Sequence, residues 1–468
     1  MKAYLVLSFL GAVVSPAVAS VVARQSKGNL PPVTVKGNAF FAGSERFYVR
    51  GVAYQPGMFC PEEINGQYTN SIIGGAADAA DPLLDIQSLK RDVANFKSLG
   101  INTIRIYTID NSKNHDEGMK MLDDAGIYLA LDANTPKYSL NRENKDTLHR
   151  SYNDVYLQSV FATVDAFAEY NNLLLFFSGN EVINAKNNSN AAPYIKAVTR
   201  DMKQYISNRH SRTIPVGYSA ADVSENINQQ ATYFNCGTDD ERSDFFAFND
   251  YSWCDPSDFK KSGWDQKVKT YGSYSKPIFL SEFGCNTNTR EWNEIAALYS
   301  ANMTSVYSGG LVYEYTVEPN GYGLVEVGSG GKIEPNADFD RLAKAYKATA
   351  NPTGSGGYKE KGDASNCPAE SDDWQVEGTN LPAIPQKAAK FMSDGAGSGP
   401  GLSGDGSHFA GEASESTATP GSGNPTRTPS PGASGGAGGQ GAAAGLDVPL
   451  RFVGMIAASA IFGAVLVF

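Results

Sequence analysis

Histidine and cysteine are scarce in this sequence of 468 residues, which contains 4 His and 5 Cys. The four histidines (His115, His149, His210 and His408) are scattered, without the short spacing typical of the ligands of a metal site. The glycine-rich stretch at 328–331 lacks the strand, lysine and helix context of a phosphate-binding loop. We therefore expect neither a metal ion nor another cofactor.

An excess of basic residues is also lacking. Lys and Arg together number 39 against 50 Asp and Glu, which gives a formal net charge of −11. This balance argues against nucleic acid and anionic membrane surfaces as partners, since both repel an acidic protein. Aromatic residues make up 11% of the chain, a content compatible with surfaces that stack on sugar rings.

Long apolar runs are confined to the two ends of the chain. Residues 1–19 combine Lys2, an apolar stretch and the small-residue motif "AVA" before Ser20, which predicts a secretory signal peptide. The apolar run at 452–468 has 17 residues, fewer than the ~20 of a typical spanning helix. Because small residues and a spacer precede it, we expect a GPI-anchor signal, 442–468, that is removed with attachment at Gly441. An ordinary membrane helix is the alternative.

Secretion would expose the cysteines to an oxidising compartment, where they form disulfides. With five cysteines, one is left over. Sequons at Asn187 and Asn302 predict N-glycosylation. We expect the protein at the outer face of the plasma membrane or in the cell wall, held to the outer leaflet by the GPI lipid.

Composition divides the rest of the chain. Residues 394–441 are mainly Gly, Ser, Thr, Ala and Pro, which predicts a disordered, O-glycosylated stalk. Residues 353–393 form a shorter extension, which we expect to pack on the preceding domain. That domain, 20–352, contains the ordinary mixture of apolar and polar residues.

Apolar strands alternate with helical stretches in the domain. Helical spacing of apolar residues and a terminal glycine predict a helix over 85–100, and other helices are expected over 154–170 and 191–209. Eight strands that alternate with helices over about 300 residues predict an α/β fold, the (β/α)8 barrel. A short N-terminal hairpin is expected to cap its bottom. The expected strands are 46–54, 103–109, 128–133, 173–179, 214–220, 245–253, 277–284 and 309–318.

Two of these strands end in a glutamate. The stretch "LLLFFSGNEVIN" leads to Glu181 after the fourth strand, and "KPIFLSEFGCN" leads to Glu282 at the seventh. Parallel barrel strands all open onto one face at their C-terminal ends, so both carboxyl groups should lie in one cleft. Such a pair is what glycoside cleavage needs, one group as acid and the other as nucleophile.

Residues 30–350 resemble the fungal cell-wall β-1,3-glucanosyltransferases of glycoside hydrolase family 72, a family of (β/α)8 enzymes. The resemblance rests on the motifs "GVAYQPG", "TPKYSLNR", "FFSGNEV", "IPVGYSA", "DYSWC", "FLSEFGCN" and "SGGLVYEY". It implies that Glu181 is the general acid/base and Glu282 the nucleophile. Glu181 must then be protonated, which a dry, aromatic neighbourhood favours, and Glu282 must stay ionised, helped by a tyrosine hydroxyl.

The same resemblance implies a set of sugar-binding residues. Asn180 should bond the sugar 2-hydroxyl, and Tyr251 should lie close to the nucleophile. Tyr107 and Tyr313 have core packing as the alternative role. The remaining matches to sugar-contacting positions are Gln55, Asn134, Tyr138, Ser139, Asn141, Arg142 and Asp222.

The resemblance also implies two disulfides, Cys236–Cys367 and Cys254–Cys285, which leaves Cys60 as a free thiol or an intermolecular partner. The chain departs from the family in three respects. A cysteine pair common in the family is replaced by Leu89 and Gly118, and a common arginine is replaced by Ile227. The cysteine-rich carbohydrate-binding module of one family branch is absent, since no cysteine follows Cys367.

The expected activity is a retaining transfer: internal cleavage of a β-1,3-glucan donor and addition of its new reducing end to the non-reducing end of an acceptor β-1,3-glucan. Two alternatives remain. The first is an endo-β-1,3-glucanase that uses the same glutamates, and the second is an inactive wall-binding protein.

Overall fold

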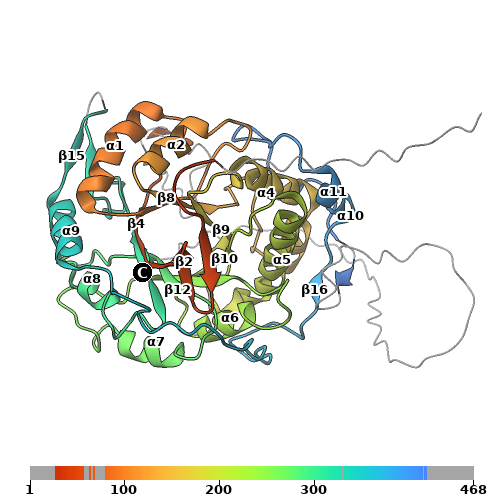
Figure 1. Cartoon of the computed structure of the whole chain (residues 1–468). Coiled ribbons are helices and arrows are strands. Elements are labelled where there is room, and N and C mark those ends of the chain that lie inside the picture. Colours follow the sequence, from red (N-terminus) through yellow and green to blue (C-terminus); the bar gives the residue numbers. More distant parts are fainter. Residues whose placement is uncertain are drawn as a thin grey trace, which may run out of the picture. The chain divides into compact units, whose positions relative to one another are not determined.

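The computed structural model describes residues 27–56, 63–64, 67–68, 80–328, 331–414 and 416–418. Eight parallel strands close into a barrel in the order β4-β7-β8-β9-β10-β11-β12-β13, with β13 pairing back to β4 (Figure 1). The (β/α)8 prediction is therefore confirmed. The barrel strands are β4 (Val49–Ala53), β7 (Thr103–Ile106), β8 (Tyr128–Asp132), β9 (Leu173–Asn180), β10 (Val216–Ala221), β11 (Phe245–Asp250), β12 (Ile278–Phe283) and β13 (Tyr307–Val312).

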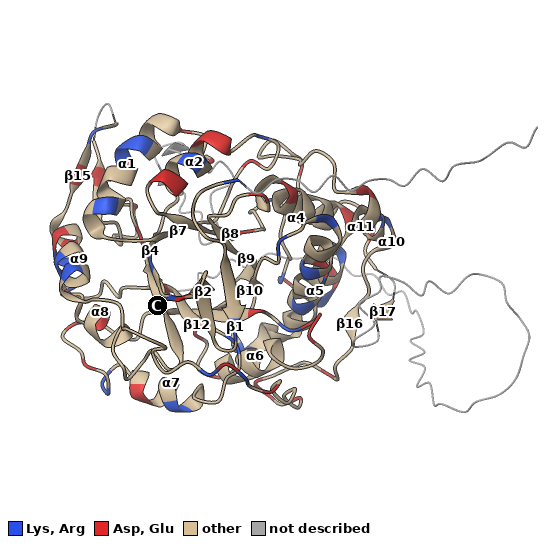
Figure 2. Ribbon diagram, viewed as in Figure 1, with Lys and Arg blue, Asp and Glu red and all other residues tan. Residues whose placement is uncertain are grey.

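Helices surround the barrel, and charged residues mark both these helices and the loops between the elements (Figure 2). In α1, the Asp85 side chain caps the N-terminus by accepting from the backbone N–H of Ser88, and Gly100 ends the helix at φ 72°. The helices in chain order are α1 (Ile86–Leu99), α2 (Asp116–Asp124), α3 (Lys145–Ser151), α4 (Asp154–Phe167), η1 (Lys186–Ala191), α5 (Ala192–Arg209), α6 (Ile227–Phe234), α7 (Trp264–Thr270), α8 (Asn293–Leu298) and α9 (Ala337–Ala348).

The bottom of the barrel is closed by a three-stranded antiparallel sheet, where a two-stranded hairpin was expected. Its strands are β1 (Val33–Lys36), β2 (Ala39–Ala42) and β3 (Glu45–Phe47). Phe40 on β2 is fully buried, and its ring lies 6.2 Å from that of Phe245 and 5.8 Å from that of Phe279. Burial of one such ring contributes about 2–3 kcal/mol. The plug leaves the opposite, C-terminal end of the strands as the face available for a site.

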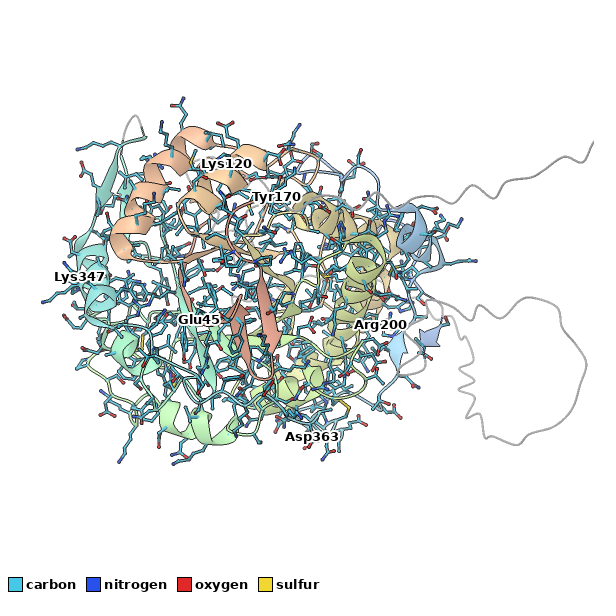
Figure 3. All side chains as sticks on the ribbon, in the orientation of Figure 1. Glu45, Lys120, Tyr170, Arg200, Lys347 and Asp363 are labelled. Carbon is cyan, nitrogen blue, oxygen red and sulfur yellow. A yellow bond between two sulfur atoms is a disulfide. The ribbon has the colours of Figure 1, made fainter. Side chains whose placement is uncertain are left out.

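Small sheets lie outside the barrel. The antiparallel pairs are β5 (Glu63–Ile64) with β6 (Gln67–Tyr68), and β14 (Val325–Val327) with β15 (Ile333–Pro335). Side chains fill the space between the strands and the surrounding helices (Figure 3), so the barrel is a packed core and has no open pore.

Residues 353–394 run along the outside of the barrel and are tied to it by a disulfide. Cys367 bonds Cys236 with a Cα–Cα distance of 5.1 Å, and Cys254 bonds Cys285 at 5.0 Å, which are the two implied bridges. The short elements β16 (Leu381–Pro382), α10 (Gln386–Ala389) and α11 (Phe391–Asp394) lie beside α4 and α5 (Figure 1).

The prediction that a disordered stalk begins at residue 394 is wrong. Residues 395–414 lie against the barrel, and β17 (Thr417–Ala418) pairs with β16. The physical reason is that several glycines in this segment are packing residues. A Cβ atom on Gly399 would lie 2.2 Å from Asn111 Oδ1, and one on Gly404 would lie 2.1 Å from the Tyr138 hydroxyl. Composition alone does not distinguish such glycines from those of a flexible linker.

Several predicted features lie outside the described residues: the signal peptide at 1–19, Cys60, the attachment site Gly441 and the apolar tail. Within the described ranges, no helix has both the length and the apolar character needed to cross a membrane.

Candidate active site

Glu181 and Glu282 lie at the C-terminal ends of β9 and β12, on the same face of the barrel. The strands β9, β10, β11 and β12 pair side by side. At their C-terminal ends, Asn180 of β9 pairs with Ser219 of β10, Ala221 of β10 pairs with Asn249 of β11, and Asn249 pairs with Glu282 of β12. Asn249 connects the two glutamates. Its Nδ2 donates to Glu181 Oε1 at 2.6 Å, and its strand, β11, pairs with β12, which contains Glu282. The structure therefore brings the two predicted glutamates into one polar cluster.

Glu282 is a buried carboxyl group with a donor on each oxygen. The Tyr107 hydroxyl donates to Oε1 at 2.8 Å, and the Tyr251 hydroxyl donates to Oε2 at 2.8 Å. Arg105 Nη1 also donates to Oε1, at 3.3 Å. These three donors are the polar neighbours expected of a carboxylate that must act as a nucleophile.

Burial, and after it the negative charge of Glu181, raise the pKa of Glu282, whose net value is about 7. The Arg105 guanidinium and the hydrogen bonds from Tyr107 and Tyr251 lower this pKa, although less than burial raises it. The tyrosine hydroxyls thus favour the carboxylate form of Glu282, but burial opposes them with a larger effect. A proton on Glu181 would remove the repulsion between the two carboxylates, so ionisation of Glu282 is easier when Glu181 is protonated.

Arg105 is a fully buried cation on β7 that sequence reasoning missed. Its Nε and Nη2 atoms form a bidentate pair with Asp132, at 2.9 and 3.1 Å. The guanidinium lies between the rings of Tyr107 and Phe177, 4.4 and 4.3 Å from their centroids. Desolvation opposes its charge, but Asp132, Tyr107 and Glu282 outweigh that effect and raise the pKa of Arg105. The sequence feature that could have indicated this buried cation is a single charged residue inside the apolar strand "TIRIY".

The backbone at Glu181 has a left-handed conformation, with φ 48°. This region costs a non-glycine residue about 1 kcal/mol, and such strain is common where a side chain must be aimed. The backbone N–H of Glu181 donates to Ser219 O at 2.8 Å, and its carbonyl accepts from Arg142 Nη1 at 2.5 Å. The chain therefore leaves β9 abruptly and turns the carboxyl group toward Asn249.

Asn180 is held by a chain of serine hydroxyls. Its Oδ1 accepts from Ser219 Oγ at 2.7 Å, and Ser219 is also 2.8 Å from Ser281 Oγ. Ser281 Oγ in turn donates to Asn249 Oδ1 at 2.9 Å. Because Oδ1 of Asn180 is occupied, its amide nitrogen is the group left to face a ligand.

A cluster of three tyrosine rings lies beside Glu282. The centroids of Tyr251 and Tyr313 are 6.4 Å apart, those of Tyr251 and Tyr322 are 5.5 Å apart, and those of Tyr313 and Tyr322 are 5.4 Å apart. Tyr313 is half-buried, which leaves part of its ring available to a ligand. Tyr322 was not predicted, because it lies in the loop after β13 with no strand-end pattern around it.

Other predicted residues have structural partners in this region. The Gln55 Oε1 atom accepts from the backbone N–H groups of Tyr107 and Thr108, at 3.1 and 2.9 Å, so this side chain positions the end of β7. Asn134 Oδ1 accepts from the Tyr156 hydroxyl, and Asn134 Nδ2 is buried with no hydrogen-bond partner among the described residues.

Asp222 is paired with a cation. Lys267 Nζ lies 2.6 Å from Asp222 and 2.8 Å from Asp250. Burial raises the pKa of Asp222, and Lys267 opposes that shift. Ile227, the replacement for the family arginine, is buried as the first residue of α6.

The structure does not leave all of the loop 134–142 free for a ligand. The Tyr138 hydroxyl accepts from the backbone N–H of Gly406 at 3.3 Å, and Ser139 Oγ lies 3.0 Å from His408 Nε2. The Asn141 side chain accepts from the Glu143 backbone N–H. In the described structure, Tyr138 and Ser139 are thus contacts of the C-terminal segment.

A large surface cavity of about 490 Å³ lies elsewhere, at the C-terminal end of α5. It is lined by Arg200 (labelled in Figure 3), Lys203 and Arg212, among others. Two carboxyl groups line it, Asp240 and Asp244. Asp244 is paired with Lys203 at 3.0 Å, and Asp240 accepts from the Thr238 hydroxyl. Neither follows a barrel strand at its C-terminal end, so the size of this cavity does not make it the candidate active site. Among the described residues, no group of three or more His, Cys, Asp or Glu is arranged to hold a metal ion.

Comparisons with known proteins agree with this geometry. The family model described as glucanosyltransferase, glycoside hydrolase family 72, matches residues 22–350. The chain is 57% identical over 405 residues to the 1,3-beta-glucanosyltransferase gel1 of Aspergillus fumigatus, covering 86% of this chain and 85% of that protein. It is 48% identical over 400 residues to the 1,3-beta-glucanosyltransferase GAS5 of Saccharomyces cerevisiae, covering 84% and 78%.

Solved structures of Saccharomyces cerevisiae Gas2p have the same fold. The apo form of a Gas2p mutant matches with a TM-score of 0.68 and 35% identity, covering 77% of this chain and 74% of that one. A Gas2p mutant in complex with laminaritetraose and laminaripentaose matches with a TM-score of 0.67 and 34% identity, covering 77% and 76%.

Proposed function

The chain belongs to the glucanosyltransferases of glycoside hydrolase family 72, and we propose that it lengthens β-1,3-glucan by cutting one chain internally and joining the new reducing end to another. The observation that carries the proposal is the placement of Glu181 and Glu282 on one barrel face, with Glu282 buried among three donors. The laminari-oligosaccharides bound to the related Gas2p support a β-1,3-glucan substrate.

In the first step, we assign Glu282 as the nucleophile and Glu181 as the acid. A Glu282 oxygen attacks the anomeric carbon, and the bond from that carbon to the glycosidic oxygen breaks. The proton of Glu181 moves to the departing oxygen, so the leaving glucan ends in a hydroxyl. Arg105, Tyr107 and Tyr251 hold Glu282 by its two oxygens, which fixes the attacking group and stabilises its charge before reaction.

In the second step, the hydroxyl at the non-reducing end of an acceptor glucan attacks the same carbon. Glu181, now a carboxylate, takes the hydroxyl proton, and the bond to Glu282 breaks. Two inversions give net retention of the β configuration. Water in place of the acceptor would give hydrolysis, so transfer requires a surface that holds sugar better than solvent. The Tyr251, Tyr313 and Tyr322 rings supply aromatic faces of the kind that stack on sugars.

We also propose that the protein is secreted and carried at the cell surface. The signal at 1–19 and the GPI attachment at Gly441 rest on the sequence. Both sequon asparagines, Asn187 and Asn302, are exposed in the structure, as N-glycosylation requires. Partners would be donor and acceptor β-1,3-glucans and, through the anchor lipid, the outer membrane leaflet.

Incubation of the purified protein with a β-1,3-gluco-oligosaccharide of a single length tests the proposal. A transferase gives products both longer and shorter than the substrate. Shorter products alone would assign an endo-β-1,3-glucanase, and no turnover would assign a wall-binding protein.

A further inference from the structure

A segment that composition assigned to a linker is fastened to the barrel along its length. We call residues 395–414 the strap. Near its start, the Ala396 backbone N–H donates to the Tyr205 hydroxyl at 2.8 Å, and Gln158 Nε2 donates to the Ala396 and Ser398 carbonyls, both at 2.8 Å. These contacts attach the strap to α4 and α5.

The middle and end of the strap are attached as well. The Gly401 backbone N–H donates to Asn111 Oδ1, a buried atom, at 2.9 Å. Asn153 Nδ2 donates to the Ser407 carbonyl at 2.7 Å. The Glu412 backbone N–H donates to Asp154 Oδ1 at 2.5 Å, at the start of α4.

Between these attachments, the strap holds three consecutive residues of the loop 134–142. Lys137 Nζ donates to the Leu402 carbonyl at 3.0 Å, and the Ser407 backbone N–H donates to the Lys137 carbonyl at 2.8 Å. The next two residues, Tyr138 and Ser139, bond Gly406 and His408, as described above. Contacts to successive loop residues restrict the loop backbone more than one isolated bond would.

The restrained loop leads directly to the candidate acid. Arg142, at the end of the loop, donates to the backbone carbonyl of Glu181 at 2.5 Å. That carbonyl belongs to the residue with φ 48°, whose backbone depends on its surroundings to keep a strained conformation. His408 is thus linked to Glu181 by its contact with Ser139, the loop backbone from Ser139 to Arg142, and the bond from Arg142 to the Glu181 carbonyl.

We propose that the strap is a positioning part of the catalytic unit, which fixes the loop 134–142 and, through Arg142, the backbone of Glu181. The inference rests on the proposed transferase function and adds residues to it. The hydrogen bonds of the strap in the described structure do not reach the side chains of Glu181 or Glu282, so the strap acts through Lys137, Tyr138 and Ser139. When the loop loosens, the Glu181 backbone loses a fixed partner; a bound acceptor hydroxyl then loses its alignment with the Glu181 carboxylate, whereas a water molecule can reorient. Transfer should therefore fall more than cleavage.

Single substitutions in the otherwise complete protein test this proposal. His408→Ala removes the contact with Ser139, and Gly404→Ala places a Cβ atom against the Tyr138 hydroxyl. Ser403→Ala, at an exposed strap residue, is the matched control. We expect the ratio of lengthened to hydrolysed product to fall at least threefold in the first two variants and to stay unchanged in the control. His408→Gln, whose amide can bond a hydroxyl, should recover most of the ratio.

Thermal midpoints and kcat for cleavage are measured on the same samples. Lower midpoints with an unchanged product ratio would show a merely structural strap and would overturn the proposal. In a double-mutant cycle, the effects of Ser139→Ala and His408→Ala on the ratio of lengthened to hydrolysed product should be non-additive. Additive effects would also overturn the proposal. If the wild-type protein lengthens no oligosaccharide, the proposed function fails by itself. The strap is then judged on kcat for cleavage, where an unchanged value in His408→Ala and Gly404→Ala rejects it.

Discussion

The Tyr251 hydroxyl donates a 2.8 Å hydrogen bond to Oε2 of Glu282, and this bond opposes the main electrostatic effect on that carboxyl group. Burial favours the neutral acid, whereas the hydroxyl donor favours the carboxylate. Glu282 is therefore balanced between two protonation states, with a pKa of about 7, and small changes around it should be visible in its titration.

Removing the hydroxyl of Tyr107 or of Tyr251 should shift the acidic limb of the pH–rate profile to higher pH. A hydrogen bond to a charged group contributes about 1.5 kcal/mol, which corresponds to roughly one pKa unit. Tyr107→Phe and Tyr251→Phe should therefore each raise the apparent pKa of the nucleophile by about one unit, with the greatest loss of kcat/KM at low pH. Tyr274→Phe, which removes a donor to the Ala231 carbonyl instead, is the control. An unshifted limb in both active-site variants would contradict the assigned role of Glu282.

Replacing either candidate carboxyl group by an amide should abolish turnover. Glu181→Gln removes the proton donor and Glu282→Gln removes the nucleophile, so each should lower kcat by at least ~10³-fold while oligosaccharide binding persists. Glu326→Gln, at an exposed β14 residue, should keep full activity. Turnover above a few per cent of wild type in either active-site variant would mean that the role is assigned to the wrong residue.

The stability of the Glu282→Gln variant relative to wild type should depend on pH. The pKa of Glu282 is raised from 4.5 to about 7 in the folded state, so its contribution to stability is present below pH 4.5 and is lost as pH rises through 7. This loss amounts to roughly 3 kcal/mol in wild type and is absent from the variant. Urea unfolding at pH 4.5 and pH 7.5 should therefore show the free energy of unfolding shifting in favour of the variant at the higher pH. A shift in the opposite direction would contradict the raised pKa of the buried Glu282 carboxyl group.

Loss of the Arg105 side chain should destabilise the protein strongly. Arg105→Met leaves Asp132 buried without its cation, and breaking such a pair costs about 3–5 kcal/mol. Lys120→Met breaks the exposed pair with Asp124, which should cost less than ~0.5 kcal/mol. Denaturant titration of the two variants measures both effects. Equal small losses would show that Asp132 is neutral or solvated in the folded protein.

Restoring the family's cysteine pair should stabilise the folded protein by less than the entropy of loop closure alone suggests. Leu89→Cys with Gly118→Cys would close a loop of about 29 residues, for which the chain-entropy estimate is ~3.6 kcal/mol. However, Leu89 is fully buried, and a Cβ atom on Gly118 would lie 2.4 Å from the Leu83 carbonyl oxygen. We expect the oxidised double variant to gain less than ~2 kcal/mol over wild type, given the loss of packing. A gain of the full estimate, measured by unfolding under non-reducing conditions, would show that Leu83 moves freely.

Peptide mapping of the native protein without reduction checks the other cysteines. The structure pairs Cys236 with Cys367 and Cys254 with Cys285. Cys60 should therefore be recovered as a thiol or in a link to another molecule. A bond between Cys60 and any of these four would overturn the pairing.

The sequence by itself determined the barrel and the two glutamates. Each strand is a nearly continuous apolar run, and a closed parallel barrel places the end of every such run on one face. The positions of Glu181 and Glu282 therefore followed from local pattern together with topology. Arg105 and Asn249 did not, because one charged or amide side chain within a strand has no meaning until its partners across the barrel are known.

Only the tertiary structure decided the balance of charge at Glu282 and the place of the strap. The pKa of Glu282 depends on burial and on donors from β7 and from the residue after β11, which are 177 and 31 positions away in the chain. The glycines of the strap have the composition of a linker, and their packing against Asn111 and Tyr138 is a contact across more than 260 residues. Local sequence encodes backbone preference and side-chain polarity, whereas burial and distant pairing arise only when the chain has closed on itself.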